Sequence, residues 1–212
     1  MFYLSKTPWL LKQMYPGCIW NIPTPENEVY LTFDDGPHPV ATPFVLDTLK
    51  EFNAKATFFC IGKNVKENPS LYSRILEEGH QTGNHTQNHL NGWKVSDREY
   101  LENIMEAKTF IDSRLFRPPY GKITRFQIKL LTENAPKQTS FKIIMWDVLS
   151  ADFDLKLNGN QCADKVLKNV KKGSVVVFHD SQKALPRLKI ALPIVMEELT
   201  KRGLLCRTIG NI

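Results

Sequence analysis

The sequence predicts a single α/β domain built on a parallel β-sheet. Short apolar runs alternate along the chain with longer amphipathic stretches, which is the pattern of β/α units. Gly173 and Gly203 each stand between a helical stretch and the apolar run that follows it, where a helix C-cap is expected. With 212 residues the chain has the length of one domain. About seven β/α units in one domain favour a parallel sheet, closed as a barrel or left partly open.

The composition excludes several other classes of protein. Hydrophobic residues make up 42% and charged residues 24% of the chain, which is ordinary for a globular protein and excludes a disordered, collagen-like or coiled-coil chain. No apolar run approaches the roughly 20 residues that cross a bilayer, so we expect no membrane span. The formal net charge of +6 would suit an anionic partner, but the basic residues are scattered, and we expect a solvated surface and no nucleic-acid binding.

The cysteines and the N-terminal segment carry little functional signal. The four cysteines form no C-x-x-C pair, so we expect free thiols rather than a zinc knuckle or a redox site. Residues 1–26 form a proline-marked lead-in that we expect to be irregular, and residues 27–212 form the single domain. The start of the chain lacks the apolar core and the cleavage site of a secretory signal, which predicts a cytoplasmic protein.

The first half of the domain shows two strand patterns and three helix patterns. Strands are expected at residues 29–33 and 56–61, where β-branched and aromatic residues gather. Helices are expected at residues 43–52, 68–78 and 96–114. Leu71 and Ile75 share one face of the second helix, and Gly79 is placed as its C-cap. Ser96 and Glu99 form a capping box at the start of the third helix.

The second half continues the alternation. Helices are expected at residues 125–133, 161–170 and 184–201, and strands at 142–148, 174–178 and 204–208. The chain contains no internal repeat and no linker within residues 27–212. In parallel β/α folds the chemistry collects at the C-terminal ends of the strands, so the polar residues that follow each predicted strand are the candidates for a site.

Carboxylates follow the first predicted strand, and two histidines come in the third β/α unit. Asp34 and Asp35 come directly after the first strand, and two adjacent carboxylates repel each other unless they share a cation or a proton. His85 and His89 are four residues apart, which would place both imidazoles on one face if the segment were helical. Two histidines and one carboxylate are a ligand set that leaves zinc an open position for water.

Three later segments add further polar groups. In Arg117-Pro118-Pro119-Tyr120-Gly121 the prolines have no N–H, so the first free amide after Arg117 belongs to Tyr120 and would suit an oxyanion; a purely structural proline turn is the alternative. Asp147 lies near the end of the strand expected at 142–148 and Asp152 follows it, while His179 comes directly after the strand expected at 174–178. Packing alone does not predict polar groups at five strand ends.

Four of these motifs together resemble a known family. The segments 32–37, 85–89, 117–121 and 177–179, in this order and spacing, are similar to motifs of the polysaccharide deacetylases with the NodB homology domain, carbohydrate esterase family four. The similarity extends over residues 27–212. It implies a distorted, incomplete (β/α) barrel and metal-dependent removal of acetyl groups from sugars.

The resemblance also implies a role for each motif residue. Asp34 would be the general base and His179 the general acid. A divalent metal, most often zinc and in some members cobalt or nickel, would be held by Asp35, His85 and His89. Arg117 would orient Asp34, the Tyr120 amide would bind the oxyanion, and Asp152 would pair with the acid histidine.

The sequence departs from the family pattern near the substrate. Leu149 and Phe153 stand where the fourth motif has a polar residue and a Trp or Tyr, and Val177 replaces the leucine of the fifth. The function expected is removal of N-acetyl groups from amino-sugar oligomers or polysaccharides such as chitin oligosaccharide or peptidoglycan. An O-acetyl esterase acting on xylan-like sugars and a catalytically idle carbohydrate-binding relative are the alternatives. In each case the partner is an acetylated carbohydrate, while its identity and the oligomeric state stay open.

Overall fold

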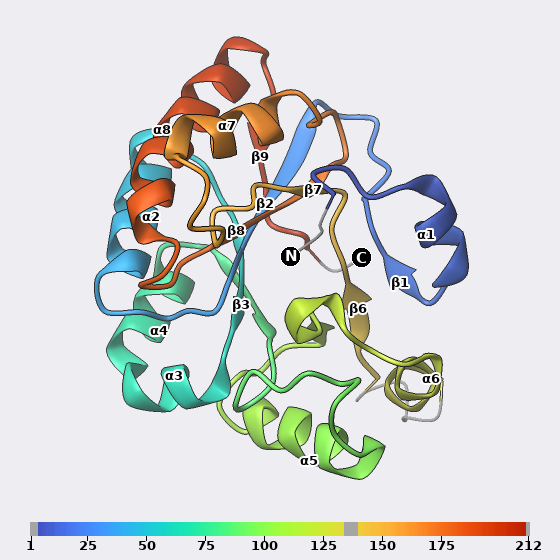
Figure 1. Cartoon of the computed structure of the whole chain (residues 1–212). Coiled ribbons are helices and arrows are strands. Elements are labelled where there is room, and N and C mark those ends of the chain that lie inside the picture. Colours follow the sequence, from blue (N-terminus) through green and yellow to red (C-terminus); the bar gives the residue numbers. More distant parts are fainter. Residues whose placement is uncertain (1–3, 134–139, 211–212) are drawn as a thin grey trace.

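The structure, a computed structural model, describes residues 4–133 and 140–210. Its sheet has the order β1 (Cys18–Ile19), β6 (Lys142–Ile144), β5 (Leu115–Phe116), β4 (Gln81–Asn84), β3 (Thr57–Cys60), β2 (Glu28–Asp34), β8 (Val175–His179) and β7 (Val148–Leu149), and β9 (Leu205–Cys206) pairs with the start of β2. All of these pairs are parallel. The sheet curls into an incomplete barrel (Figure 1), which confirms the predicted fold class.

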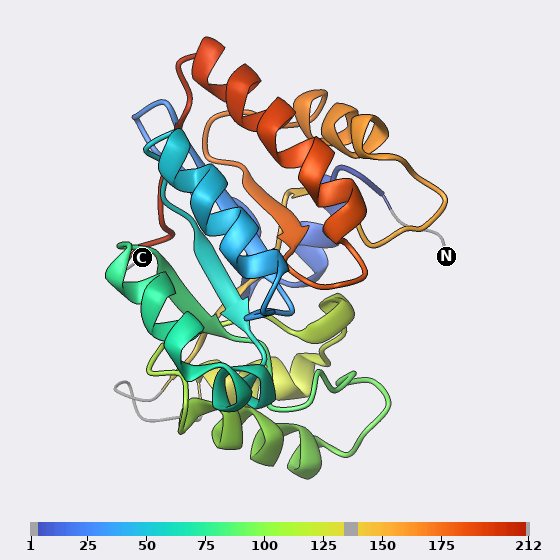
Figure 2. The same ribbon diagram turned by 90° about the vertical axis from the view of Figure 1, so that its left-hand side faces the viewer.

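Helices cover the outside of the curled sheet. α2 (Ala41–Glu51), α4 (Pro69–Glu77) and α8 (Leu185–Lys201) lie side by side, as Figure 2 shows, and α7 (Gly159–Leu167) packs against α8. α5 (Asp97–Lys108) lies against β4 and α6 (Arg125–Thr132) against β6, while α3 (Gly62–Glu67) precedes α4. Within the described residues no helix is long and apolar enough to cross a membrane.

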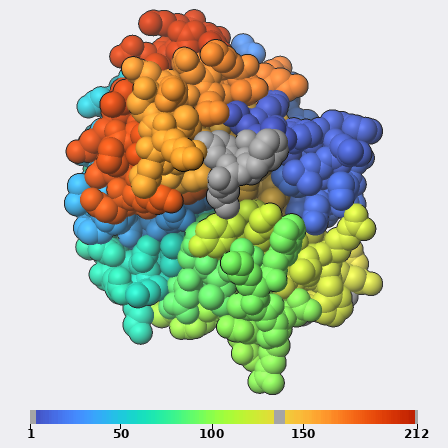
Figure 3. Space-filling view, viewed as in Figure 1, coloured from blue at the N-terminus to red at the C-terminus, as the bar shows by residue number. Residues whose placement is uncertain are grey.

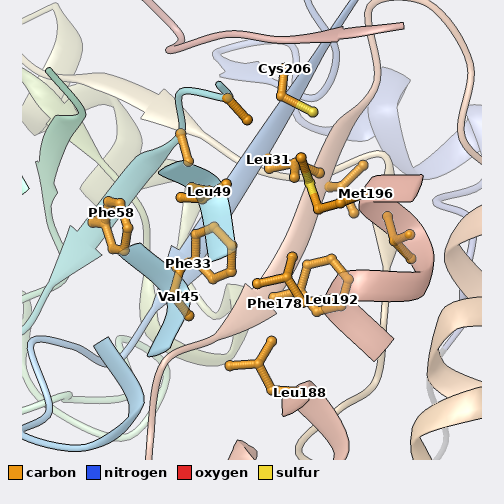
Figure 4. Close-up of a cluster of buried hydrophobic side chains, with 14 of the residues drawn as sticks. Leu31, Phe33, Val45, Leu49, Phe58, Phe178, Leu188, Leu192, Met196 and Cys206 are labelled. Atoms are coloured by element: carbon orange, nitrogen blue, oxygen red, sulfur yellow. The ribbon is translucent and has the colours of Figure 1, made fainter. Parts of the chain in front are cut away.

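The main core lies between β2, β3, β8 and the helices α2 and α8 (Figure 4). The ring of Phe33 stacks between those of Phe58 and Phe178, with centroids 5.2 and 6.0 Å away. Leu188 and Leu192 of α8 pack against this cluster and are fully buried, each contributing about 2 kcal/mol through burial. This packing fixes the central strands whose C-terminal ends carry the site. The four cysteines are buried and free, as expected.

Within residues 4–26 the N-terminal segment is not irregular, which corrects the expectation for this part of the lead-in; residues 1–3 lie outside the described residues. It contains the helix α1 (Trp9–Met14) and the strand β1. Lys6 forms an antiparallel bridge with Val148 of β7, whereas β1 pairs with β6 near the opposite edge of the sheet. The ammonium groups of Lys6 and Lys12 lie 2.6 and 2.8 Å from the buried Asp147 carboxylate. The segment therefore connects the two edges of the open barrel. Its elements are too short for periodicity to reveal them.

The strand predicted at 142–148 is two strands at opposite sides of the sheet. The amide of Met145 donates to Ile19 in β1, whereas that of Asp147 donates to Val175 in β8, so residues 145–147 cross the barrel opening. The apolar run continues into this crossing because Met145 and Trp146 pack against buried hydrophobic clusters, so the run does not reveal where the first strand ends.

Other predicted elements shift by a few residues. The helix expected at 96–114 is capped by Ser96, as predicted, but ends at Lys108. α3 was not predicted, and β4 and β5 were implied by the polar residues that follow them but were given no bounds. β5 has only two residues and β4 is polar, with the sequence Gln-Thr-Gly-Asn, so neither has an apolar pattern of useful length.

Candidate active site

The carboxylate of Asp34, at the end of β2, is held by a buried arginine. Nη1 of Arg117 donates to Asp34 Oδ1 over 2.7 Å and to the hydroxyl of Thr32 over 2.6 Å. Its Nε and Nη2 donate to the carbonyls of Ile144 and Met145. The guanidinium also lies 4.0 Å from the centre of the Phe59 ring. Because Arg117 is fully buried and bonded on several sides, it fixes the position of the Asp34 carboxylate.

Asp35, His85 and His89 converge on one point. Their candidate ligand atoms all lie within 4.8 Å of one another. Oδ1 of Asp35 is 3.1 Å from Nε2 of His89 and 3.7 Å from Nε2 of His85. This oxygen is buried and has no hydrogen-bond partner of good geometry. A buried carboxylate oxygen without a hydrogen bond is costly, and a cation at the point where the three groups meet would compensate it.

The ring nitrogens that face away from this point have their own partners. Nδ1 of His85 lies 2.7 Å from the carbonyl oxygen of Arg117, which can only accept, so Nδ1 carries the proton and the lone pair is on Nε2. Burial lowers the pKa of His85 to about 4, which keeps the imidazole neutral and able to bind a metal. Nδ1 of His89 lies 3.1 Å from the hydroxyl of Tyr120.

The two histidines do not lie on a helix, so the helical spacing considered for residues 85–89 is wrong. The segment leaves β4 as a loop, with left-handed φ values of 66° at Thr86 and 57° at His89. The side-chain oxygen of Asn84 accepts the amide of Thr86, and that of Asn103 in α5 accepts the next two amides. These hydrogen bonds shape a turn that brings both imidazoles to the same point.

On the neighbouring strand, His179 is paired with Asp152. Oδ1 of Asp152 lies 2.7 Å from Nδ1 of His179, and Oδ2 accepts the backbone amide of His179. Burial lowers the pKa of His179, but the carboxylate of Asp152 outweighs this effect and raises it to about 9. β2 and β8 pair so that His179 lies opposite Asp34. The arrangement therefore places a charged imidazole beside a carboxylate.

The side chain of Tyr120 packs against His89, one of the candidate metal ligands. Tyr120 sits in the 3-10 turn η1 (Pro119–Gly121) with a left-handed φ of 60°. Its ring centroid is 4.6 Å from that of His89. The turn's hydrogen bonds are donated by the amides of Gly121 and Lys122, which leaves the Tyr120 amide outside them.

Unfavourable backbone conformations gather in the same loops. Positive φ values occur at Asp35, Thr86, His89, Tyr120 and Ala151, all non-glycine residues in or next to the motifs. Each such conformation costs about 1–3 kcal/mol and persists where surrounding contacts enforce it, which is typical of functional sites.

Sequence reasoning missed two supporting residues. Thr32 bonds Arg117, as described above. Asp180, directly after His179, is fully buried and accepts the amide of Gly36 and the hydroxyl of Thr42, and so holds the loop that follows Asp35. Burial raises its pKa well above the ordinary range. The position of Asp180 directly after His179 is the sequence feature that could have indicated its supporting role.

One other candidate lies outside the site, and a histidine near the first motif caps a helix. Asp147 was grouped with the strand-end carboxylates, but it bonds Lys6, Lys12 and Ser174 and anchors the N-terminal segment. The ring of His38 accepts amides at the start of α2 and acts as a helix cap.

The chain is similar to known deacetylases over most of its length. The family model described as polysaccharide deacetylase matches residues 21–137. A peptidoglycan-N-acetylglucosamine deacetylase of Bacillus cereus is 35% identical over 199 residues, which cover 91% of each chain. A chitooligosaccharide deacetylase of Sinorhizobium fredii is 36% identical over 159 residues, 72% of this chain and 71% of the relative.

A solved structure is similar to this chain in both fold and sequence. It is the crystal structure of a peptidoglycan N-acetylglucosamine deacetylase in complex with a naphthalenyl N-oxidanyl-benzamide. The TM-score is 0.86 at 34% identity, and the match covers 96% of this chain and 95% of the other. Together with the family match and the converging motif residues, this similarity shows that the chain belongs to the polysaccharide deacetylase family.

Proposed function

We propose that the protein is a metal-dependent hydrolase that removes N-acetyl groups from amino-sugar oligomers or polysaccharides of the chitin-oligosaccharide or peptidoglycan type. One observation carries the proposal: a three-residue ligand cluster adjoins an arginine-held carboxylate, Asp34, that lies opposite an aspartate-held histidine, His179. The N-deacetylase activity named for relatives that match most of the chain gives further support.

The donor set of the cluster fits a divalent metal. Neutral His85 offers Nε2, His89 offers Nε2, and the buried Oδ1 of Asp35 has no hydrogen bond to give up. Two imidazoles and one carboxylate are typical of catalytic zinc, and cobalt or nickel accept the same donors. The compound bound in the related crystal structure carries an N-hydroxyamide, a group that chelates divalent metals. A bound metal would polarise the acetyl carbonyl and acidify a water molecule.

The surrounding residues supply the proton transfers. Asp34, fixed by Arg117, takes a proton from the water whose oxygen bonds to the carbonyl carbon. The amide of Tyr120 donates to the carbonyl oxygen as it gains negative charge, a contact worth about 3 kcal/mol. Because Nδ1 of His179 is bonded to Asp152, its Nε2 donates the proton to the leaving nitrogen. The C–N bond breaks, and acetate and a free amine are released.

The alternatives differ in substrate or in the loss of one of these groups. An O-acetyl esterase would use the same residues with an alkoxide as leaving group. The departures from the family motifs at Leu149, Phe153 and Val177 lie near the substrate, so they bear on which acetylated sugar is bound. An idle carbohydrate-binding relative requires a missing base, ligand or acid, and all of these residues are in place here.

Acetate release tests the proposal. Metal-stripped protein is assayed on N-acetylglucosamine oligomers and on acetylated xylan, before and after zinc or cobalt is added. Asp34→Asn removes the base, and Asp47→Asn, at a surface carboxylate that is 64% exposed, is the charge-matched control. We expect metal-restored release from the amino sugar, retained by the control and lost in Asp34→Asn. Release from xylan alone would favour the esterase, and release from neither substrate by metal-loaded protein would contradict the proposal.

A further inference from the structure

The peptide group between Asp35 and Gly36 is held at both ends. Its carbonyl, on Asp35, accepts a hydrogen bond from Nδ2 of Asn64 over 2.7 Å, and its N–H, on Gly36, donates to Oδ1 of Asp180 over 3.1 Å. Asn64 belongs to α3, and Asp180 directly follows β8. On the face shown in Figure 3, the blue residues at the start of α2 lie between the orange residues that follow β8 and the teal residues that include α3. The loop after β2 is therefore fixed between these two elements.

This peptide group adjoins an unfavourable backbone conformation at Asp35. The φ of Asp35 is 80°, in the left-handed region that a non-glycine residue rarely adopts. Such a conformation persists only where surrounding contacts enforce it, and hydrogen bonds on the adjoining carbonyl and N–H are contacts of that kind. In this conformation Oδ1 of Asp35 lies 3.1 Å from Nε2 of His89 and 3.7 Å from Nε2 of His85. The held backbone thus accompanies the convergence of the candidate metal ligands.

Asp180 forms a fixed support for the loop. Its side chain is fully buried, and its own amide donates to the carbonyl of Asp34 at the end of β2. Its Oδ2 accepts the hydroxyl of Thr42 over 2.5 Å, and the oxygen of this hydroxyl accepts the amide of His38. A Cβ on Gly36 would lie 2.0 Å from Oδ2 of Asp180, so glycine is needed where the loop meets this carboxylate. One side chain therefore bonds both ends of the loop between β2 and α2.

α3 joins the two loops that carry the candidate metal ligands. The amides of Gly62 and Lys63, in its first turn, donate to the carbonyls of Thr86 and Gln87 over 3.0 and 3.1 Å. These two carbonyls lie in the loop of the paired histidines. Through Asn64 the same helix bonds the loop that follows β2. α3 therefore fixes the loop of the carboxylate relative to the loop of the imidazoles.

We infer that Asn64 and Asp180 are positioning residues for the bound metal. By fixing the peptide group after Asp35, they hold its carboxylate toward the two histidines before a metal binds. Ligands that are already in place lose little entropy on binding, so these hydrogen bonds raise the affinity for the metal. In this role neither side chain contacts the metal. The inference rests on the proposed function, because it requires the metal site.

Zinc affinity tests the role of Asn64. It is measured for the full-length, metal-stripped chain by competition with a chelator. Loss of an outer contact typically costs about 10–100-fold in metal affinity, and we expect a loss of this size in Asn64→Ala. Asn169→Ala removes another half-buried amide that donates to a backbone carbonyl, that of Lys165 over 2.8 Å, and should leave the affinity unchanged. Equal zinc affinity in Asn64→Ala, Asn169→Ala and the wild type would overturn the inference.

Two substitutions at Asp180 separate positioning from charge. Asp180→Asn keeps an oxygen that can accept the amide of Gly36, whereas Asp180→Leu has a similar size but no acceptor. We expect zinc affinity close to that of the wild type in Asp180→Asn and a loss of about 10-fold or more in Asp180→Leu. If Asp180→Leu does not fold, Thr42→Val removes the hydroxyl bonded to Oδ2, and Thr42→Ser keeps it and should restore the affinity. An equal loss in Asp180→Asn and Asp180→Leu would assign the effect to charge and overturn the positioning role.

Metal binding and acetate release, measured on the same proteins, separate failure of this inference from failure of the proposed function. A wild type that binds zinc and releases acetate, with unchanged zinc affinity in Asn64→Ala and Asp180→Leu, overturns the positioning role alone. A wild type that binds zinc but releases no acetate, with lowered affinity in these variants, supports the positioning role and contradicts deacetylation. A wild type that binds no zinc, cobalt or nickel contradicts both.

Discussion

Asp152 holds His179 at two points, with one carboxylate oxygen 2.7 Å from Nδ1 and the other bonded to the backbone amide of the same residue. The double contact orients the imidazole, and the buried negative charge keeps it protonated. The proposed acid is therefore charged at neutral pH because of one neighbouring carboxylate.

Asp152→Asn should move the alkaline limit of activity. A general acid works only while protonated, so the rate falls as pH rises through the pKa of His179, which is about 9. Without the carboxylate the largest influence that raises the pKa is lost, while the burial that lowers it remains, so the pKa of His179 falls. We expect the alkaline limb of the kcat/KM profile to shift down by about two pH units or more. Asp164→Asn, an exposed charge-matched change, should leave the limb in place. An unshifted limb in Asp152→Asn would assign the acid to another group.

Tyr120→Phe should weaken metal binding. The hydroxyl fixes His89 through Nδ1, and loss of such an outer contact typically costs 10–100-fold in metal affinity. The backbone amide is unchanged, so the rate at saturating metal should fall much less. The measurement is zinc affinity by competition with a chelator. Tyr72→Phe, which loses a hydroxyl contact with Thr82, is the matched control. Equal affinity in Tyr120→Phe and wild type would show that the contact does not support the ligand.

Arg117→Met should destabilise the protein strongly. It leaves the carboxylate of Asp34 buried without its partner, which costs about 3–5 kcal/mol. Denaturant unfolding measures the loss, and Arg98→Met, at an exposed ion pair, should leave the midpoint of unfolding near that of wild type. Adding Asp34→Asn to Arg117→Met should recover part of the stability because the unpaired charge is gone. A double variant as unstable as the sum of the two single variants would argue against a coupled pair.

Asp147→Asn should release the N-terminal segment. Burial raises the pKa of Asp147, but the ammonium groups of Lys12 and Lys6 and the hydroxyl of Ser174 outweigh it, so the pKa lies below the ordinary carboxyl value. The stabilisation is therefore present above the ordinary pKa and is lost as pH falls through the lowered one. We expect faster proteolytic cleavage within residues 4–21, with zinc affinity unchanged. Cleavage at the wild-type rate would mean that other contacts hold the segment.

The sequence was most informative where polar residues follow apolar strands. Asp34 and His179 end strands long enough to be recognised, and the parallel arrangement brings such ends together. The sequence predicted that His85 and His89 act together but not how their side chains are placed. Thr86 and His89 have left-handed φ values, and the periodicity of a sequence does not reveal such values.

Short or polar elements were out of reach of sequence reasoning. β5 and β7 have two residues each, and their places in the sheet depend on partners far away in the chain. The N-terminal segment is held by ion pairs from Lys6 and Lys12 to Asp147. Each lysine is more than 130 residues away from Asp147 in sequence. Contacts of this separation leave no local pattern.

The most direct test of the central account is a zinc titration of metal-stripped protein in which bound metal and acetate release from N-acetylglucosamine oligomers are followed together. The account predicts that activity rises in proportion to the first zinc ion bound per chain, and that His89→Ala abolishes both binding and release. Full activity in the stripped protein, or tight stoichiometric binding that survives His89→Ala, would contradict it.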